Sequence, residues 1–166
     1  MKPQDAGRIG AMIVFMFGAS ASLWAADIWT KDFEAAKAQA AKEQKDLLVD
    51  FTGSDWCAWC IKLDTEVFDT PAFEEQAPKS FILVKLDFLR KTQQAPEIVK
   101  HNRELQSKYR VEGFPTILLM NAQGEPFAKT GYQPGGAESY LKHLQALRSG
   151  KTDLAEIRKG LAIADG

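Results

Sequence analysis

The sequence has little of what marks several common protein classes. It contains two cysteines and two histidines in 166 residues, which excludes a small domain held together by several disulfides and a histidine-rich metal site. Its 21 basic and 22 acidic residues leave a net charge of −1, so no positive excess favours nucleic acid or an anionic membrane surface. The sequence shows no internal repeat and no low-complexity tract. Its length and its 45% hydrophobic content are those of one globular domain that can bury a core.

The N-terminal 21 residues have the three-part layout of a signal peptide. Lys2 and Arg8 precede the uncharged run from Ile9 to Gly18, and the small residues 19–21 follow. This order predicts export with cleavage after residue 21, or as late as residue 26. A retained membrane anchor is the alternative, because the uncharged run from Ile9 to Ala26 has 18 residues, the lower limit for a spanning helix. Export would place the cysteines in an oxidising compartment, the periplasm or the outside of the cell.

Hydrophobic periodicity predicts alternating helices and strands in the rest of the chain. The predicted helices cover residues 29–45, 57–67, 71–77, 97–109 and 136–150, and the predicted strands cover residues 47–51, 81–86, 116–120 and 126–130. Strands separated by helices predict an α/β domain over residues 27–150, with a mixed sheet and helices on both faces. Residues 151–166 form a C-terminal tail whose leucine and isoleucine spacing allows a short helix.

The two cysteines lie three residues apart, in the segment Cys57-Ala58-Trp59-Cys60. The segment follows a predicted strand and loop and opens a predicted helix, which is the usual context of a redox-active cysteine pair. The amide N–H groups and the dipole at the start of that helix favour a thiolate at Cys57. We therefore expect Cys57 to be the nucleophile and Cys60 the resolving thiol. A static disulfide, half of a zinc site and an idle pair remain alternatives, although no second Cys or His pair at ligand spacing supports zinc.

Two charged residues interrupt predicted strands. Asp50 lies in the apolar segment 47–51, and Lys85 lies in the segment 81–86. A carboxylate in a buried strand is costly unless it is paired or functional. Both residues are therefore candidate catalytic groups, although either side chain could instead point to an exposed face of the sheet.

Three segments and a late glycine resemble the thioredoxin superfamily. The segments are Val49 to Cys60, Val84 to Asp87 and Tyr109 to Met120, and the glycine is Gly131. The resemblance covers about two thirds of the chain, residues 47–147. It is nearest to exported thioredoxin-like proteins with a Trp-Cys-x-Trp-Cys site, which include thiol:disulfide interchange proteins. It implies a thioredoxin fold and disulfide exchange with protein substrates through the two cysteines.

The resemblance also implies roles for further residues. Asp50 matches the family's buried acid beneath the second cysteine, where burial raises the carboxyl pKa and allows it to accept the proton of Cys60. Lys85 matches a nearby lysine, which would lower that pKa. Pro115 matches the family's cis-proline, which faces the disulfide and exposes the backbone of Phe114 to a substrate chain. The expected substrate-binding residues are Trp56, Trp59, Gly113, Phe114 and Pro115.

The chain departs from cytosolic thioredoxin at two places that bear on function. Ala58-Trp59 replaces the usual Gly-Pro between the cysteines. This uncharged pair cannot stabilise the Cys57 thiolate as strongly as a strong oxidant requires, so we expect the reductase or isomerase direction. The stretch from Phe88 to Lys108 is interpreted as an insertion that alters the partner surface.

We expect an exported protein dithiol–disulfide oxidoreductase that needs no organic cofactor and no metal, since the cysteine pair carries the electrons. Its partners would be protein thiols and disulfides and an upstream electron donor, without nucleic acid and, once the signal is removed, without a membrane. A non-catalytic thioredoxin-fold binding module with a structural disulfide is one alternative. A copper-delivering metallochaperone is another, for which Met120 is the only methionine after residue 21.

Overall fold

Five strands form one mixed sheet in a computed structural model that describes residues 27–164, with side chains for residues 27–150. The predicted signal peptide lies outside the described residues. The strand order is β1-β3-β2-β4-β5, with β2 parallel to β3 and antiparallel to β4. The strands are β1 (Trp29–Thr30), β2 (Asp46–Thr52), β3 (Phe81–Asp87), β4 (Thr116–Met120) and β5 (Pro126–Thr130).

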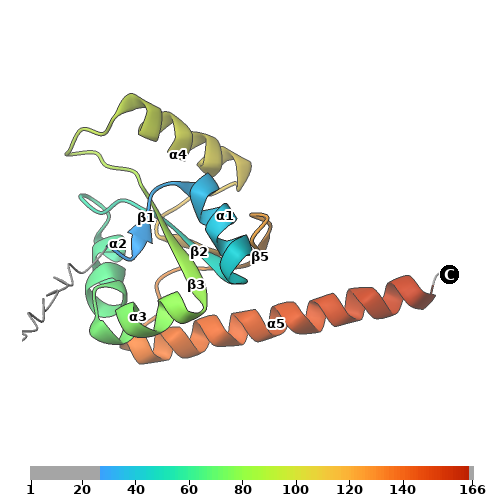
Figure 1. Ribbon diagram of the computed structural model, residues 1–166. Coiled ribbons are helices and arrows are strands. Elements are labelled where there is room, and N and C mark those ends of the chain that lie inside the picture. Colours follow the sequence, from blue (N-terminus) through green and yellow to red (C-terminus); the bar gives the residue numbers. More distant parts are fainter. Residues whose placement is uncertain (1–26, 165–166) are drawn as a thin grey trace, which may run out of the picture.

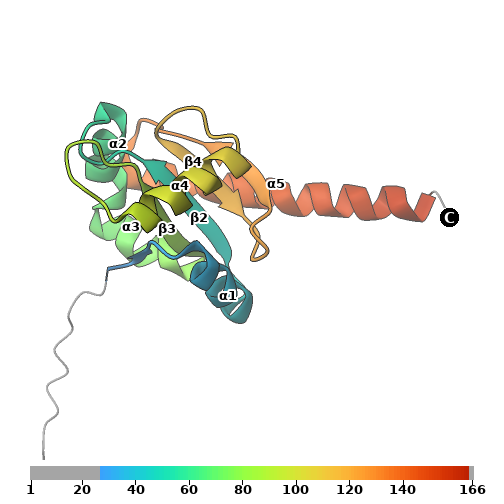
Figure 2. The same ribbon diagram turned by 90° about the horizontal axis from the view of Figure 1, so that it is seen from above.

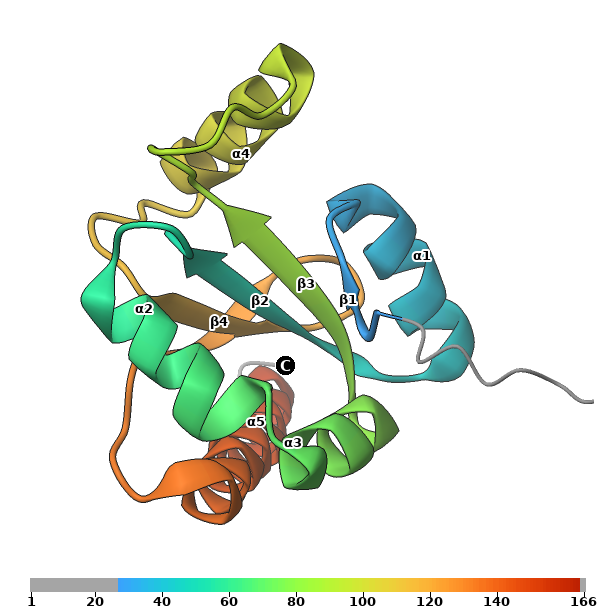
Figure 3. The same cartoon turned by 90° about the vertical axis from the view of Figure 1, so that its left-hand side faces the viewer.

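Helices cover both faces of the sheet, as predicted (Figure 1). One face carries α1 (Phe33–Glu43) and α4 (Pro96–Lys108), which lie in front of the strands in Figure 2. The other face carries α2 (Ala58–Leu63), α3 (Pro71–Gln76) and α5 (Gly136–Ala164), grouped below the sheet in Figure 3. A π-helical turn, Asp64–Phe68, continues α2, and a 3-10 turn, Ala77–Lys79, follows α3. No helix within residues 27–164 has the length and apolar content needed to cross a membrane.

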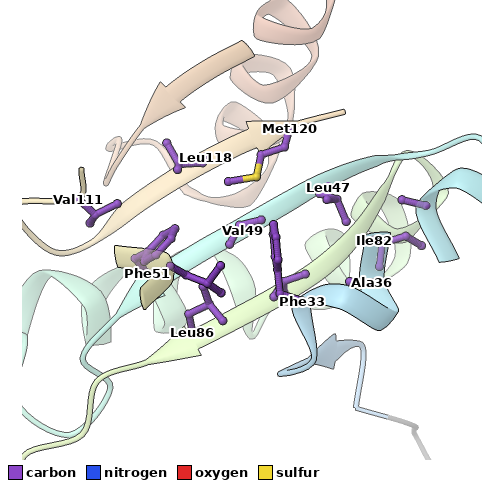
Figure 4. Close-up of a cluster of buried hydrophobic side chains, with 13 residues drawn as sticks. Phe33, Ala36, Leu47, Val49, Phe51, Ile82, Leu86, Val111, Leu118 and Met120 are labelled. Carbon is purple, nitrogen blue, oxygen red and sulfur yellow. The ribbon is translucent and has the colours of Figure 1, made fainter. Parts of the chain in front are cut away.

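The alternation of side chains along β2 divides the core into two clusters. Leu47, Val49 and Phe51 pack in the cluster beneath α1 and α4 (Figure 4), whereas Leu48 packs in the cluster beneath α2, α3 and α5. All seven residues of β2 are buried, as a central strand covered on both faces requires. Asp50 follows Leu48 by two residues and therefore faces the α2 side of the sheet.

The predicted helix over residues 29–45 is wrong at its start. Trp29 and Thr30 form β1, pairing in parallel with residues 83 and 84 of β3. The helix begins only at Phe33, after Asp32, whose side chain accepts the backbone N–H of Ala35 at 2.9 Å. Helix propensity favours this segment throughout, but the open edge of β3 and the Asp32 cap decide where the helix starts.

The predicted end of the last helix at Gly150 is also wrong. The helix α5 continues from Gly136 to Ala164 and extends well past the sheet (Figure 1). A helical glycine costs only about 1 kcal/mol relative to alanine, and the residues around Gly150 are mostly good helix formers. A single glycine without a C-capping conformation therefore does not end this helix.

A pair of substitutions at Gly150 tests the continuity of α5. No heavy atom lies within 4 Å of the position that a Cβ would take there, so Gly150→Ala should stabilise the helix locally by about 1 kcal/mol. Hydrogen exchange of the amides around residue 150 should then slow by about fivefold. Gly150→Pro should break the helix and lower the far-ultraviolet helical signal. Unchanged helical signal in the proline variant would show that the helix ends before residue 150.

Candidate active site

The two cysteines form a disulfide at the start of α2. Cys57 is the N-cap residue, with an extended backbone, and its sulfur accepts the N–H of Cys60 at 3.2 Å. Cys60 lies on the first turn of the helix and is 1% exposed, compared with 7% for Cys57. A partner can therefore reach the sulfur of Cys57 before that of Cys60, which is the placement that the predicted nucleophile and resolving thiol require.

The indole of Trp56 packs against Gly53, a position where a side chain would not fit. A Cβ on Gly53 would lie 2.5 Å from the indole nitrogen of Trp56. That nitrogen donates a hydrogen bond to the carbonyl of Phe88 at 2.7 Å, and the indole meets the ring of Phe114 edge-on at 5.9 Å between centroids. Trp56 precedes the N-cap of α2 and therefore lies outside the helix that carries Leu63.

The peptide bond between Phe114 and Pro115 is cis, as predicted. Thr116 stabilises the preceding turn by donating its hydroxyl to the carbonyl of Gly113 at 2.7 Å. Gly131 leaves room for the carbonyl of Pro115, which would lie 3.1 Å from a Cβ at that position. Gly113 is exposed, and Phe114 and Pro115 are half-buried. The contact between the rings of Phe114 and Trp56 places this segment beside the residue that precedes the nucleophile.

Trp59, between the cysteines, is exposed, with 57% of its surface accessible. Its ring lies 5.2 Å from that of Tyr132, and the ammonium group of Lys62 lies over both rings. Ile61 is also exposed. Sequence reasoning selected only Trp59 from this group, because Tyr132 is brought to it from the far end of the chain by the loop after β5.

Asp50 is buried without a hydrogen-bond partner. It is 1% exposed, and neither of its carboxylate oxygens has a partner among the described residues. Burial raises the pKa of this carboxyl well above its ordinary value, the positive charge of Lys85 opposes the rise, and the carboxylates of Asp64 and Asp87 add to it. The carboxyl of Asp50 therefore keeps its proton to a higher pH than that of an exposed aspartate.

Lys85 stands opposite Asp50 in the pairing of β2 with β3, but its ammonium group bonds elsewhere. It forms an ion pair with Asp64 at 2.9 Å. Burial lowers the pKa of Lys85, and the contact with Asp64 more than offsets this, so the pKa is raised. Burial raises the pKa of Asp64 despite the ion pair. Sequence reasoning missed Asp64, although its position four residues after Cys60 places it on the same helical face.

The chain is similar to known proteins in both sequence and structure. The family described as a thioredoxin-like domain matches residues 33–147. The disulfide bond reductase DsbH of Chlamydia pneumoniae is 32% identical over 122 residues, which are 74% of each chain. The thiol:disulfide interchange protein DsbD of Vibrio vulnificus is 32% identical over 120 residues, which are 70% of this chain and 18% of that protein. This chain thus spans less than a fifth of DsbD.

Solved structures give the same result. The structure of DsbH oxidoreductase superposes with a TM-score of 0.68 at 32% identity, and covers 72% of this chain and 82% of the other. A thioredoxin from Thermus thermophilus superposes with a TM-score of 0.52 at 21% identity, over 72% of this chain and 85% of the other. The second match shows the fold alone.

Replacing the buried carboxyl should make stability less dependent on pH. Because the folded-state pKa of Asp50 is raised, the folded wild-type protein loses stability as pH rises from the unfolded-state pKa towards the folded one. Asp50→Asn removes this loss and should be more stable than wild type by at least about 1 kcal/mol at pH 8, with a smaller difference at pH 4. Urea unfolding of the oxidised protein at both values measures the difference.

The matched control is Glu75→Gln, at an exposed position on α3. It should change the free energy of unfolding by less than about 0.5 kcal/mol at either pH. A difference between Asp50→Asn and wild type that is the same at pH 4 and pH 8 would contradict a raised pKa for Asp50.

Proposed function

Because this chain belongs to the thioredoxin superfamily and is a thiol:disulfide oxidoreductase, we propose that it is exported and reduces or isomerises the disulfides of other proteins. The observation that carries this proposal is the Cys57–Cys60 disulfide, with Cys57 capping α2 and Cys60 buried behind it. The cysteine pair supplies both electrons of the exchange, so the reaction needs no organic cofactor.

Reduction of a substrate disulfide proceeds in two exchanges. The Cys57 thiolate attacks one substrate sulfur, which forms a mixed disulfide and releases the other substrate sulfur as a thiolate. Cys60 then gives its proton to the ionised carboxylate of Asp50 and attacks the sulfur of Cys57. This step closes the Cys57–Cys60 disulfide and releases the first substrate sulfur. Two electrons have passed to the substrate and the proton of Cys60 is held by Asp50, so a dithiol donor must return two electrons to the pair, and Asp50 returns the proton to Cys60.

The direction of electron flow is supported by the surroundings of Cys57. No Lys, Arg or His lies between Asp55 and Ile61, and the hydrogen bond from the N–H of Cys60 is the contact that would stabilise a thiolate at Cys57. Asp55, two residues before Cys57, carries a negative charge that disfavours a nearby thiolate. A weakly stabilised thiolate makes the oxidised state the more stable one, and the protein the better reductant.

Export is supported by the layout of the first 21 residues and by the naming of relatives as Dsb proteins. A periplasmic or secreted protein of this kind would act on protein thiols and disulfides there and would draw electrons from an upstream donor. Mass spectrometry of the exported protein should show a chain that begins after residue 21, or as late as after residue 26, and a retained residue 1 would contradict cleavage.

Copper delivery, the second candidate function, gains no support from the structure. Met120 is fully buried in the cluster beneath α1 and α4, so it cannot present its sulfur at the surface near the cysteines. Within the residues whose side chains are described, no three Cys, His, Asp or Glu side chains are placed to share a metal ion.

The assignment of the nucleophile is tested by alkylation of the two single-cysteine variants. At pH 7, the Cys60→Ser variant, which retains Cys57, should react with iodoacetamide about tenfold faster than the Cys57→Ser variant. The reason is that Cys57 is the more exposed thiol and lies at the start of the helix. Equal rates in the two variants would show that Cys57 is not the activated thiol.

The direction of the reaction is tested by equilibrium with glutathione redox buffers. We expect a reduction potential more negative than about −200 mV, on the side of thioredoxin rather than of DsbA. The fraction of oxidised protein can be followed by gel shift after alkylation of the free thiols. A potential more positive than about −160 mV would overturn the reductase direction and leave the fold assignment unchanged.

A further inference from the structure

A pocket of about 280 Å3 lies between the rim of the active site and α4. Its lining includes the rings of Trp56 and Phe114 and the polar side chains of Arg90, Asn102 and Arg103. The two rings belong to residues that directly precede the nucleophile Cys57 and the cis-proline Pro115. A polypeptide attached to Cys57 and lying along Phe114 would therefore pass the mouth of this pocket.

The loop that forms one wall of the pocket is fixed to the active-site turn. The carboxylate of Asp55 accepts the backbone N–H groups of Arg90, Lys91 and Thr92, at 3.0, 2.7 and 2.9 Å. Partial desolvation works to raise the pKa of Asp55, but these three amides lower it below its usual range. Asn102 of α4, also in the lining, is buried and donates its side-chain amide to the carbonyl of Asp87 at 2.9 Å. The pocket is thus built before any partner arrives.

The lining of the pocket has a net positive charge, because it contains Arg90 and Arg103 and one carboxylate, Asp87. The guanidinium of Arg90 stacks on the indole of Trp56, 3.3 Å from its centroid, and within residues 27–150 neither Arg90 nor Arg103 forms an ion pair with a carboxylate. Two carboxylates of this region have other hydrogen-bond partners. Asp55 binds the loop amides, and Asp87 accepts hydrogen bonds from the backbone and the hydroxyl of Ser54.

We propose that this pocket binds an acidic side chain of the polypeptide whose disulfide reacts at Cys57, so that the protein selects substrates with Asp or Glu beside the reacting cysteine. The inference rests on the proposed function. Guanidinium groups take carboxylates in paired, charge-assisted hydrogen bonds, and the stack on Trp56 holds one of them in place. The volume lies below the range of small-molecule and cofactor sites and suits a single side chain.

The aromatic group around Trp59 does not offer the same selection. Its nearby cation, Lys62, already has an acidic partner, since its ammonium group lies 3.7 Å from the carboxylate of Glu66. Glu66 in turn accepts the hydroxyl of Tyr132 at 2.6 Å. Discrimination by charge should therefore arise at Arg90 and Arg103 rather than at Trp59.

The test compares two disulfide-linked peptide dimers that differ only in charge, with Glu or Gln on both sides of the cysteine. The protein is reduced with dithiothreitol, desalted and mixed with each peptide, and the rate of Cys57–Cys60 disulfide formation is followed by tryptophan fluorescence. We expect the Glu peptide to react about fivefold faster at low salt, an advantage that shrinks in 0.5 M NaCl because the arginines are partly exposed.

Variants assign the preference to the pocket. Arg103→Gln and Arg90→Gln should each bring the ratio of the two rates below about twofold, and Arg103→Glu should favour a matched Lys peptide. Lys91→Gln is the control, because it removes a positive charge from the same loop while the backbone N–H that binds Asp55 remains. The fivefold ratio should persist in that variant.

Equal rates for the Glu and Gln peptides, or a ratio that persists in both arginine variants, would overturn the pocket while leaving the oxidoreductase function in place. Reduction of oxidised glutathione that depends on the arginines, with no dependence for the peptides, would assign the pocket to a small thiol and also overturn the proposal. No reaction with either peptide would overturn the proposed function itself, and this inference with it.

Discussion

Burial of the central strand β2 on both faces is the constraint on which the rest of the structure depends. Its seven residues lie between β3 and β4 and beneath two layers of helices, so each of its side chains must enter one of the two core clusters. Four of the seven residues are apolar and can enter a cluster, and Asp46 and Thr52 lie at the ends of the strand. Asp50 lies in the middle, and the charged form of its carboxyl loses hydration there without gaining a hydrogen bond.

The end of β2 also positions the disulfide, because the turn that follows this strand leads directly to Cys57. The strand stops at Thr52, the turn that follows brings Trp56 over Gly53, and Cys57 caps the helix that returns across the sheet. One element therefore positions both the proposed proton acceptor and the cysteine pair. Lys85, which lies opposite Asp50 in the pairing of β2 with β3, forms an ion pair with Asp64 instead. The structure thus places two carboxyls around one lysine and leaves Asp50 the one without a hydrogen bond.

The connection from β3 to β4 gives this site its particular surroundings. The stretch from Phe88 to Lys108, interpreted from sequence as an insertion, forms a loop and α4. The loop is tied back to the active-site turn through Asp55 and through the hydrogen bond from Trp56 to Phe88. These contacts bring two arginines beside the aromatic rim without adding any charge between the cysteines. Reactivity and partner selection can then depend on different residues of one surface.

The sequence by itself determined the α/β class, the strands β2 to β5 and the position of Cys57 at a helix start. These features rest on local signals, because hydrophobic runs, helix formers and a Cys-x-x-Cys segment act over a few residues. The cis bond before Pro115 was predicted from the resemblance to the thioredoxin superfamily. The sequence also identified Asp50 as an unusual buried acid. It placed the start of α1 and the end of α5 wrongly, because propensity is continuous across residues 29–45 and across Gly150.

Only the tertiary structure decided the features that join distant parts of the chain. The free edge of β3 converts Trp29 and Thr30 from helix to strand, and packing brings Tyr132 to Trp59 and Asp64 to Lys85. The pocket between Trp56 and Arg103 likewise joins an active-site turn to a helix more than 40 residues away in the sequence. Such contacts depend on how buried surfaces and charges are shared between elements, and this is fixed only when the whole sheet is assembled.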